Sequence, residues 1–293
     1  MIDINSKIMA DMKNGSSNMD QAIATAIEYV RLGYKKVVSA SEISTNGRVL
    51  TSDEKQLLID RINEELDYQK IDFQVLSGNL MSCDPKLMEY FHNDLISSIN
   101  YSRYILLELP STTEYKDLNK FIYDIQIKGY VPIIVHPERC KYVQENPDYL
   151  IPLKERDCLV QLDMSSVVKP KSSRLFKTAK ELLDRQMVDV VATESENAYE
   201  AEYIRDGIKS LHKIIDSDYF DLIMRLNPQL IVEDERIDRI PVLEKKSGGV
   251  LSKIFGKRRS CDCDASCSCN LRKYDLFWTN GYVDWTCNRK WNY

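Results

Sequence analysis

The sequence of 293 residues has no long apolar run and only three histidines. No stretch of about 18 apolar residues occurs, so a membrane-spanning helix is not expected. The N-terminus reads Met-Ile-Asp-Ile-Asn, whereas a secretory signal would carry basic and then apolar residues. We therefore expect a cytoplasmic folded body. Because His92 and His212 fall in expected helices, a strand end can receive a single imidazole, that of His136.

Acidic residues outnumber basic ones in the first 248 residues. Residues 249–293 carry eight Lys and Arg against four Asp, a net charge of +4, so the overall −5 leaves −9 on residues 1–248. This acidic body argues against a nucleic-acid-binding surface. Three cysteines, Cys83, Cys140 and Cys158, are scattered through the body, whereas five cysteines and all three tryptophans follow residue 249. We therefore expect the body and the tail to be separate regions with different structures and roles.

Apolar runs alternate with amphipathic segments throughout the body. The expected strands are 1–5, 36–41, 73–77, 104–109, 131–135, 158–163 and 188–193. The expected helices are 19–32, 52–69 with Ser52 as N-cap, 85–98, 115–128, 172–185 and 201–226. Seven βα units without an antiparallel meander predict an α/β fold, a distorted seven-stranded parallel (β/α) barrel. We assign the barrel to residues 1–235, a linker to 236–249 and an irregular Cys- and Trp-rich tail to 250–293.

The barrel is best marked by Val131-Pro-Ile-Ile-Val, a β-branched run that ends abruptly in His136-Pro-Glu-Arg139. Such a run fits a parallel strand that is covered on both faces. In α/β barrels the C-terminal ends of the strands build the active site, so His136 is the first candidate for chemistry. A lone histidine at such a place is about as often structural as it is a ligand.

Six segments carry a family resemblance when they are taken in order. They are Met-Ile-Asp-Ile at the start, Val-Ser-Ala-Ser41, Arg103-Tyr-Ile-Leu-Leu-Glu108, Ile-Val-His136-Pro-Glu-Arg139, Val-Val-Lys-Pro-Lys171 and Asp189-Val-Val-Ala-Thr-Glu194. In this order the body resembles bacterial manganese-dependent protein-tyrosine phosphatases of the PHP (polymerase and histidinol phosphatase) superfamily, which are associated with capsule and exopolysaccharide synthesis. The resemblance covers about residues 1–235 and implies the same distorted barrel.

The resemblance also implies a trinuclear metal site, whose ligands begin with His-x-His on the first strand. Here Asn5 and Lys7 occupy those two positions. The other positions that depart from the family pattern are Asn14, Glu42, Leu80, Glu194 and Glu196. Glu108, His136 and the phosphate-contacting Arg139 match unchanged. The resemblance thus implies the family's fold for this chain, whereas most of the family's metal ligands are replaced.

These replacements allow two hypotheses for the barrel mouth, the end of the barrel at which the C-terminal ends of the strands lie. In the first, a network of Lys7 and glutamates has replaced the metal cluster, no catalytic residue is expected, and His136 and Arg139 are vestigial. In the second, one divalent cation, Mn or Mg, is held by a residual set of ligands. That set is Glu42, Glu108, His136, Glu194 and Glu196. A phosphatase with such a rebuilt site is the corresponding enzymatic hypothesis.

The tail begins after a charged linker that ends in Gly248-Gly249. Its cysteines are Cys261, Cys263, Cys267, Cys269 and Cys287. The C-x-C-x3-C-x-C spacing is compatible with zinc, whose usual structural spacing is wider. Glycine pairs before Cys-rich segments resemble the leader–core junction of modified peptides. We therefore expect an inactive carrier barrel whose tail is modified, cleaved after Gly249 and exported, with modifying enzymes and a peptidase-transporter as partners. The alternative is a metal-dependent tyrosine phosphatase, or a regulatory pseudophosphatase of polysaccharide synthesis, with a metal-binding tail.

Overall fold

The computed structural model describes residues 1–9, 17–43, 51–84, 90 and 96–244. These residues belong to one compact unit that spans Met1–Lys245. The tail, with its cysteines, and the predicted cleavage position at Gly248 and Gly249 lie outside the described residues. Asn14 and most of the helix expected at 85–98 lie outside them as well.

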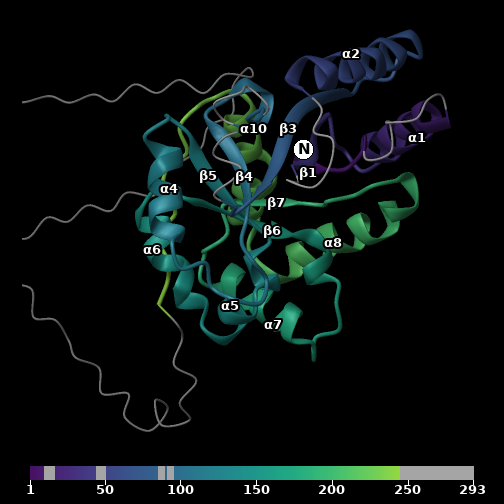
Figure 1. Cartoon of the computed structure of the whole chain (residues 1–293). Helices are drawn as coiled ribbons and strands as arrows, with labels where there is room; N and C mark the ends of the chain where they lie inside the picture. The colour runs from purple at the N-terminus through teal and green to yellow at the C-terminus, as the bar shows by residue number, and fades with distance from the viewer. Residues whose placement is uncertain (10–16, 44–50, 85–89, 91–95, 245–293) are drawn as a thin grey trace, which may run out of the picture. The chain divides into compact units, whose positions relative to one another are not determined.

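Seven parallel strands follow one another in sequence order around the barrel (Figure 1). They are β1 (Ile2–Ser6), β2 (Lys36–Ile43), β3 (Gln74–Ser82), β4 (Tyr104–Glu108), β5 (Val131–Val135), β6 (Leu159–Asp163) and β7 (Val190–Ala192). The last strand returns to the first, because the amide of Glu194 donates to the carbonyl of Asn5 and that of Lys7 to the carbonyl of Ser195, both at 2.8 Å. The barrel is nearly closed, which confirms the predicted fold class.

Strand β5 shows why the central strands are continuous apolar runs. Ile133 and Val135 pack inside the barrel, whereas Ile134 between them packs in the outer core against the helices. Side chains of a strand alternate between its two faces, so a strand that is covered on both faces needs apolar residues at every position. A polar residue directly after such a run therefore marks the end of the strand.

Helices surround the strands on the outside (Figure 1). They are α1 (Ser17–Arg31), α2 (Ser52–Tyr68), α4 (Leu118–Gln126), α5 (Lys141–Glu145), α6 (Ile151–Glu155), α7 (Arg174–Asp184), α8 (Ala201–Ile214), α9 (Ser217–Asp221) and α10 (Asn227–Val232). The exception is α10, whose Ile231 and Val232 join the interior cluster that contains Ile4 and Val38. No helix among the described residues is long and apolar enough to cross a membrane.

Two local predictions were wrong. Helix α2 is capped by Thr51, because its hydroxyl accepts from the amide of Glu54 at 3.2 Å and the Glu54 carboxylate accepts from the Thr51 amide at 3.0 Å. This reciprocal pair satisfies two free amides at once, so the helix begins one residue earlier than Ser52 would place it. The single helix expected at 201–226 is broken after Ile214, where Asp216 caps α9 by accepting from the amide of Tyr219 at 2.8 Å.

Candidate functional site

His136 lies just beyond β5 at the C-terminal end of the barrel. Its backbone is left-handed, with φ 37° and ψ 49°, and Glu194 beyond β7 also has a positive φ of 54°. Left-handed backbone is unfavourable for side chains that have a Cβ, and such strain often accompanies functional sites. The His136 side chain is buried, with Nε2 at 3.1 Å from Oε1 of Glu194 and 3.5 Å from Oε1 of Glu108. The structure thus brings together three residues that the sequence analysis had singled out.

The protonation of this group follows from its burial. Burial, and then the positive charge of Arg139, lowers the pKa of His136 to about 4, although Glu108 and Asp163 oppose the shift. Burial raises the pKa of Glu194, with Arg139 opposing that shift. His136 is therefore a neutral imidazole at neutral pH, and a hydrogen bond from its Nε2 to Glu194 requires the Nε2–H tautomer.

Arg139 binds two carboxylates at the mouth. Its Nη1 lies 2.9 Å from Oε2 of Glu194, and its Nη2 pairs with Oδ2 of the fully buried Asp163. Burial alone would lower the pKa of Arg139, but Asp163 and Glu194 outweigh it and the pKa is raised. The guanidinium is therefore engaged on both sides within the chain, and an incoming anion must compete with these two carboxylates.

Lys7 supplies the second cation of the mouth. Its Nζ lies 3.0 Å from Oε1 of Glu42 and 3.7 Å from Oε1 of Glu196. Burial would lower the pKa of Lys7, but the hydrogen bond and the charge of Glu42 outweigh it and the pKa is raised. Lys7 stays charged at neutral pH and offsets the glutamates around it.

Asn5 and Leu80 are buried at two further positions that depart from the family pattern. Nδ2 of Asn5 donates to Oε1 of Gln161 at 3.2 Å and lies 3.5 Å from Oε1 of Glu194. Oδ1 of Asn5 and Nε2 of Gln161 have no hydrogen-bond partner among the described residues. Leu80 is part of the apolar interior of the barrel and offers no ligand atom.

Three buried acids of this region were not singled out from the sequence. Asp163 ends β6 and binds Arg139. Glu138 accepts from Ser166 Oγ at 2.8 Å and from the Asp163 amide at 3.0 Å, and burial raises its pKa to about 8. Burial likewise raises the pKa of Asp3 to about 6, although Thr193 and Tyr29 donate to it. The strand-end rule that identified His136 would have identified Asp163 as well.

The donor set that the described residues supply at the mouth does not fit a cluster of several metal ions. Among the described residues, no three His, Cys, Asp or Glu side chains gather closely enough to coordinate one ion. A cluster of divalent ions needs a surplus of anionic and imidazole donors to offset the mutual repulsion of the ions. Here Lys7 holds Glu42 and Glu196, and Arg139 holds Glu194 and Asp163. Each of these four carboxylates is thus already paired with one of two cations of the chain itself.

The fold is a parallel (β/α) barrel with a cluster of charged side chains at the C-terminal ends of its strands. The family model described as "Capsular polysaccharide synthesis, CpsB/CapC" matches residues 1–233, and the chain belongs to this family. It is 25% identical over 259 residues to the tyrosine-protein phosphatase YwqE of Bacillus subtilis, which covers 87% of this chain and 99% of YwqE. It is 28% identical over 206 residues to the tyrosine-protein phosphatase CpsB of Streptococcus pneumoniae, covering 67% of this chain and 83% of CpsB.

A solved structure supports the same fold. The structure described as that of YwqE and CpsB, "unique metal-dependent tyrosine phosphatases", superposes with a TM-score of 0.75 at 24% identity. It covers 84% of this chain and 100% of the other. At this level of identity the likeness extends to the fold and does not transfer the metal site.

These comparisons correct one prediction. The barrel was expected to be an inactive carrier for a modified peptide, but relatives that this chain matches over 99% of their own length are named tyrosine phosphatases. The expectation of a carrier domain is therefore wrong. The expectation rested on the resemblance of the tail to a peptide core, for which only residue types and a glycine pair were available. The barrel motifs, which agree in order from residue 1 to residue 194, were the stronger evidence for function.

Proposed function

We propose that this protein takes part in capsular polysaccharide synthesis as a regulatory pseudophosphatase, which binds a tyrosine-phosphorylated partner without hydrolysing it. The ion pair between Lys7 and Glu42, at 3.0 Å, carries this proposal. An ammonium group within this cluster of carboxylates opposes the binding of further cations by direct charge repulsion. It also uses Glu42, which would otherwise be available as a ligand.

The charges of the mouth argue against hydrolysis. Hydrolysis of a phosphoryl group requires a nucleophile and a neutralised leaving group, which metal ions supply in metal-dependent phosphatases. His136, with its pKa near 4, is a poor general acid at neutral pH, and both Glu194 and Asp163 are held by Arg139. Arg139, whose side chain is 38% exposed, is the group best placed to contact a phosphoryl oxygen.

A second candidate is a metal-dependent tyrosine phosphatase with a rebuilt, single-cation site. The names of the relatives favour it, and so does Glu108, whose carboxylate is 38% exposed and lies 3.5 Å from Nε2 of His136. No cationic side chain is paired with Glu108 in the described part of the chain. Glu108 and His136 could thus hold one hard cation between them, with water completing its coordination.

Hydrolysis and metal content distinguish the two candidates. Purified full-length protein would be assayed with p-nitrophenyl phosphate and a phosphotyrosyl peptide, with Mn²⁺ added and after chelation, beside a His136→Ala variant. We expect that Mn²⁺ does not stimulate hydrolysis by the wild type, so that wild type and His136→Ala behave alike. We also expect less than one bound metal ion per chain. Calorimetry should still detect the phosphotyrosyl peptide, with weaker binding by Arg139→Met. Mn²⁺-dependent turnover that is lost in His136→Ala would establish the second candidate and refute the first.

A further inference from the structure

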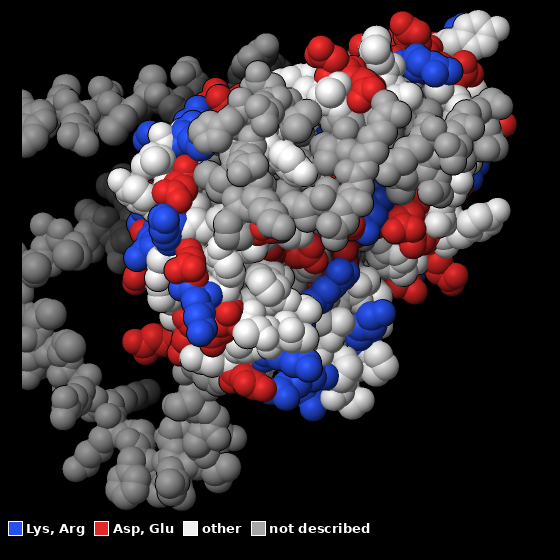
Figure 2. All heavy atoms as spheres, in the orientation of Figure 1, with Lys and Arg blue, Asp and Glu red and all other residues white. Residues whose placement is uncertain are grey.

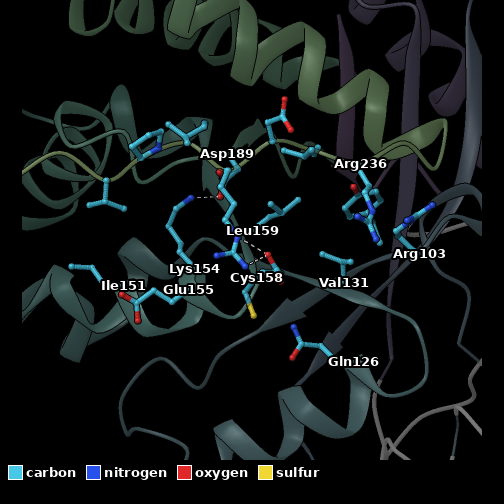
Figure 3. A pocket seen from close by; sticks show the side chains of 18 of the residues that line it. Arg103, Gln126, Val131, Ile151, Lys154, Glu155, Cys158, Leu159, Asp189 and Arg236 are labelled. Atoms are coloured by element: carbon cyan, nitrogen blue, oxygen red, sulfur yellow. Dashed lines mark hydrogen bonds and ion pairs between the residues drawn. The ribbon is translucent and has the colours of Figure 1, made fainter. Parts of the chain in front are cut away.

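A cavity of about 940 Å³ lies among the residues labelled in Figure 3. It is lined by the starts of strands whose opposite ends lead to the mouth at His136. Its barrel wall includes Tyr104, Val131 and Leu159, which are the first residues of β4, β5 and β6. The segment 236–244 forms the other wall. The volume falls in the range of small-molecule pockets. Because the mouth lies beyond the last residues of the same strands, the cavity is a separate place in the fold.

The cavity has an apolar lining on both sides. Val131, Leu159 and Ile151 face it from the barrel, while Ile237 and Val242 face it from the segment 236–244. Tyr104 anchors the start of that segment, since its hydroxyl donates to the carbonyl of Glu235 at 2.6 Å. An apolar body could remove these side chains from water, at about 25 cal/mol for each Å² buried.

Two buried cations belong to the same cavity. Nζ of Lys154 lies 2.6 Å from Oδ2 of Asp189, and the two side chains are 9% and 2% exposed (Figure 3). Arg185 is also buried, with Nη2 at 2.7 Å from Oδ1 of Asp148, a side chain that is 60% exposed. An ammonium group has three hydrogens to donate, and Asp189 accounts for one of them. The other hydrogens of Lys154 can serve a ligand.

The remaining charged residues of the lining lie nearer to water. Arg103 is paired with Asp234, with Nε at 2.9 Å from Oδ1. The exposed charges are Arg236, Arg239, Glu155, Asp157, Asp238 and Glu244. Exposed charges are screened by solvent, whereas buried ones act at lower dielectric. Lys154 and Arg185 are therefore the cations of the lining that are best shielded from solvent. Arg185 is paired with Asp148 and, at 3.8 Å, with Glu181, so the hydrogens of Lys154 that Asp189 does not use are the main donors left for a ligand.

We propose that this cavity binds a small amphipathic anion, a molecule with an apolar chain and a phosphate or carboxylate head. The chain would lie against Val131, Leu159 and Ile237, and the head would accept hydrogen bonds from Lys154, with Arg185 adding positive charge. Such a ligand would also fasten the segment 236–244, which is held through Leu243: its amide donates to the Arg185 carbonyl at 2.9 Å, and its carbonyl accepts from Arg185 Nε at 3.2 Å.

Titration calorimetry of the full chain with monomeric decyl phosphate tests the proposal. We expect saturable binding of one molecule per chain, with decanol and inorganic phosphate each binding at least tenfold more weakly. Two variants should weaken the binding of decyl phosphate at least tenfold: Lys154→Met combined with Asp189→Asn, which leaves no unpaired charge, and Ile237→Trp, which fills the cavity from the irregular segment. The exposed Lys141→Met is the matched control and should bind as the wild type does.

Several results would overturn the proposal. One is the absence of saturable binding by wild-type protein that circular dichroism shows to be folded. Another is equal binding of decanol, which would mean an apolar groove without selectivity for anions. Unchanged binding by both variants would place the ligand elsewhere. Binding to anionic phospholipid vesicles without binding of decyl phosphate would indicate a membrane surface and refute a small-molecule site. None of these readouts depends on phosphatase activity.

Discussion

The ammonium nitrogen of Lys7 lies 3.0 Å from Oε1 of Glu42, so the first strand end and the second are joined by an ion pair at the mouth of the barrel. The two side chains are 26% and 61% exposed. Ion pairs with this exposure contribute modestly by themselves. Their importance here is electrostatic, because Lys7 offsets a group of carboxylates that would otherwise repel one another.

Replacing Lys7 with methionine should therefore destabilise the protein by about 1 kcal/mol, the upper end of what exposed pairs contribute. Glu42 and Glu196 lose their common partner and repel each other across the mouth. Urea unfolding at low ionic strength would measure the change, and added salt should reduce it. Lys35→Met, which removes the exposed pair with Asp72, is the matched control and should change the stability less. Equal effects for the two variants would contradict a special role of Lys7.

Lys55 allows a prediction on pH dependence. Its side chain is buried against β3, with Nζ donating to the carbonyl of Gly78 at 2.6 Å, and burial lowers its pKa from 10.5 to about 7. The unfolded chain binds the proton more tightly than the folded one, so the native state is penalised in full below pH 7 and not at all above pH 10.5. Lys55→Met should therefore be more stable than the wild type at pH 6.

This advantage of Lys55→Met should shrink steadily as the pH rises from 7 to 10, where the lost hydrogen bond to Gly78 leaves the variant about 1 kcal/mol less stable. Thermal unfolding at several pH values would follow it. The exposed Lys120→Met serves as control and should show no such trend. A stability difference that does not depend on pH would refute the lowered pKa.

Glu138 should make the protein less stable as the pH rises, which is the reverse of the effect of Lys55. Burial raises its pKa from 4.5 to about 8, so the folded protein keeps a proton that the unfolded chain has already lost. Stability contributed by this group is complete below pH 4.5 and is lost as the pH rises toward 8. The free energy of unfolding of the wild type should fall by up to about 1.4 kcal/mol per pH unit because of this group. Glu138→Gln, an uncharged isostere, should lack this part of the fall.

The measurement for Glu138 is the free energy of unfolding in urea between pH 5 and 9. Glu138→Gln should be at least as stable as the wild type at pH 9, because its amide can still accept from Ser166 and from the Asp163 amide. Glu155→Gln is an exposed control on α6. Parallel pH curves for Glu138→Gln and the wild type would contradict the prediction.

Tyr29 tests the buried network behind β1. Its hydroxyl contacts Oδ2 of Asp3 at 2.7 Å and Oγ1 of Thr193 at 2.6 Å, and all three side chains are buried. Tyr29→Phe removes a donor from a buried carboxyl group, which typically costs about 1–3 kcal/mol. Chemical denaturation would measure the loss. Tyr68→Phe, at a position that is 83% exposed, should have no measurable effect. A loss below 0.5 kcal/mol, within the scatter of ordinary surface changes, would show that water replaces the hydroxyl.

Much of the barrel could be predicted because its strands are buried on both faces. The run that ends at Val135 needed no knowledge of its neighbours, since only a doubly covered strand is apolar at every position. Helix boundaries were less certain: Thr51 and Ser52 are both good N-caps by residue type, and the reciprocal bonds with Glu54 decide between them. The break after Ile214 depends on the capping bond of Asp216, which the hydrophobic pattern of the helix does not reveal.

The mouth was only partly predictable. His136, Glu108 and Glu194 were expected at strand ends, and parallel strands bring their ends to one edge whatever the details of packing. Gln161 was missed because a polar residue inside a buried strand has no evident role until its partner is known. Asp163 ends β6, so the strand-end rule covers it although the sequence analysis did not apply it there. Glu138 lies in the turn Pro137–Arg139, and its role depends on Ser166 and the Asp163 amide, which are distant in the chain. The partner of Asp163 is Arg139, 24 positions away in the chain.

The sequence by itself determined the class of fold, the strand ends at which polar groups appear and the family to which the chain belongs, because these depend on local periodicity and on the order of motifs. Only the tertiary structure decided which charges neutralise one another. Lys7 meets Glu42, Arg139 meets Asp163 and Glu194, and the cavity beneath Val131 is completed by residues 236–244. The reason is physical: an ion pair or a cavity depends on distances across the barrel, and those distances exist only when all seven strands have closed around their interior.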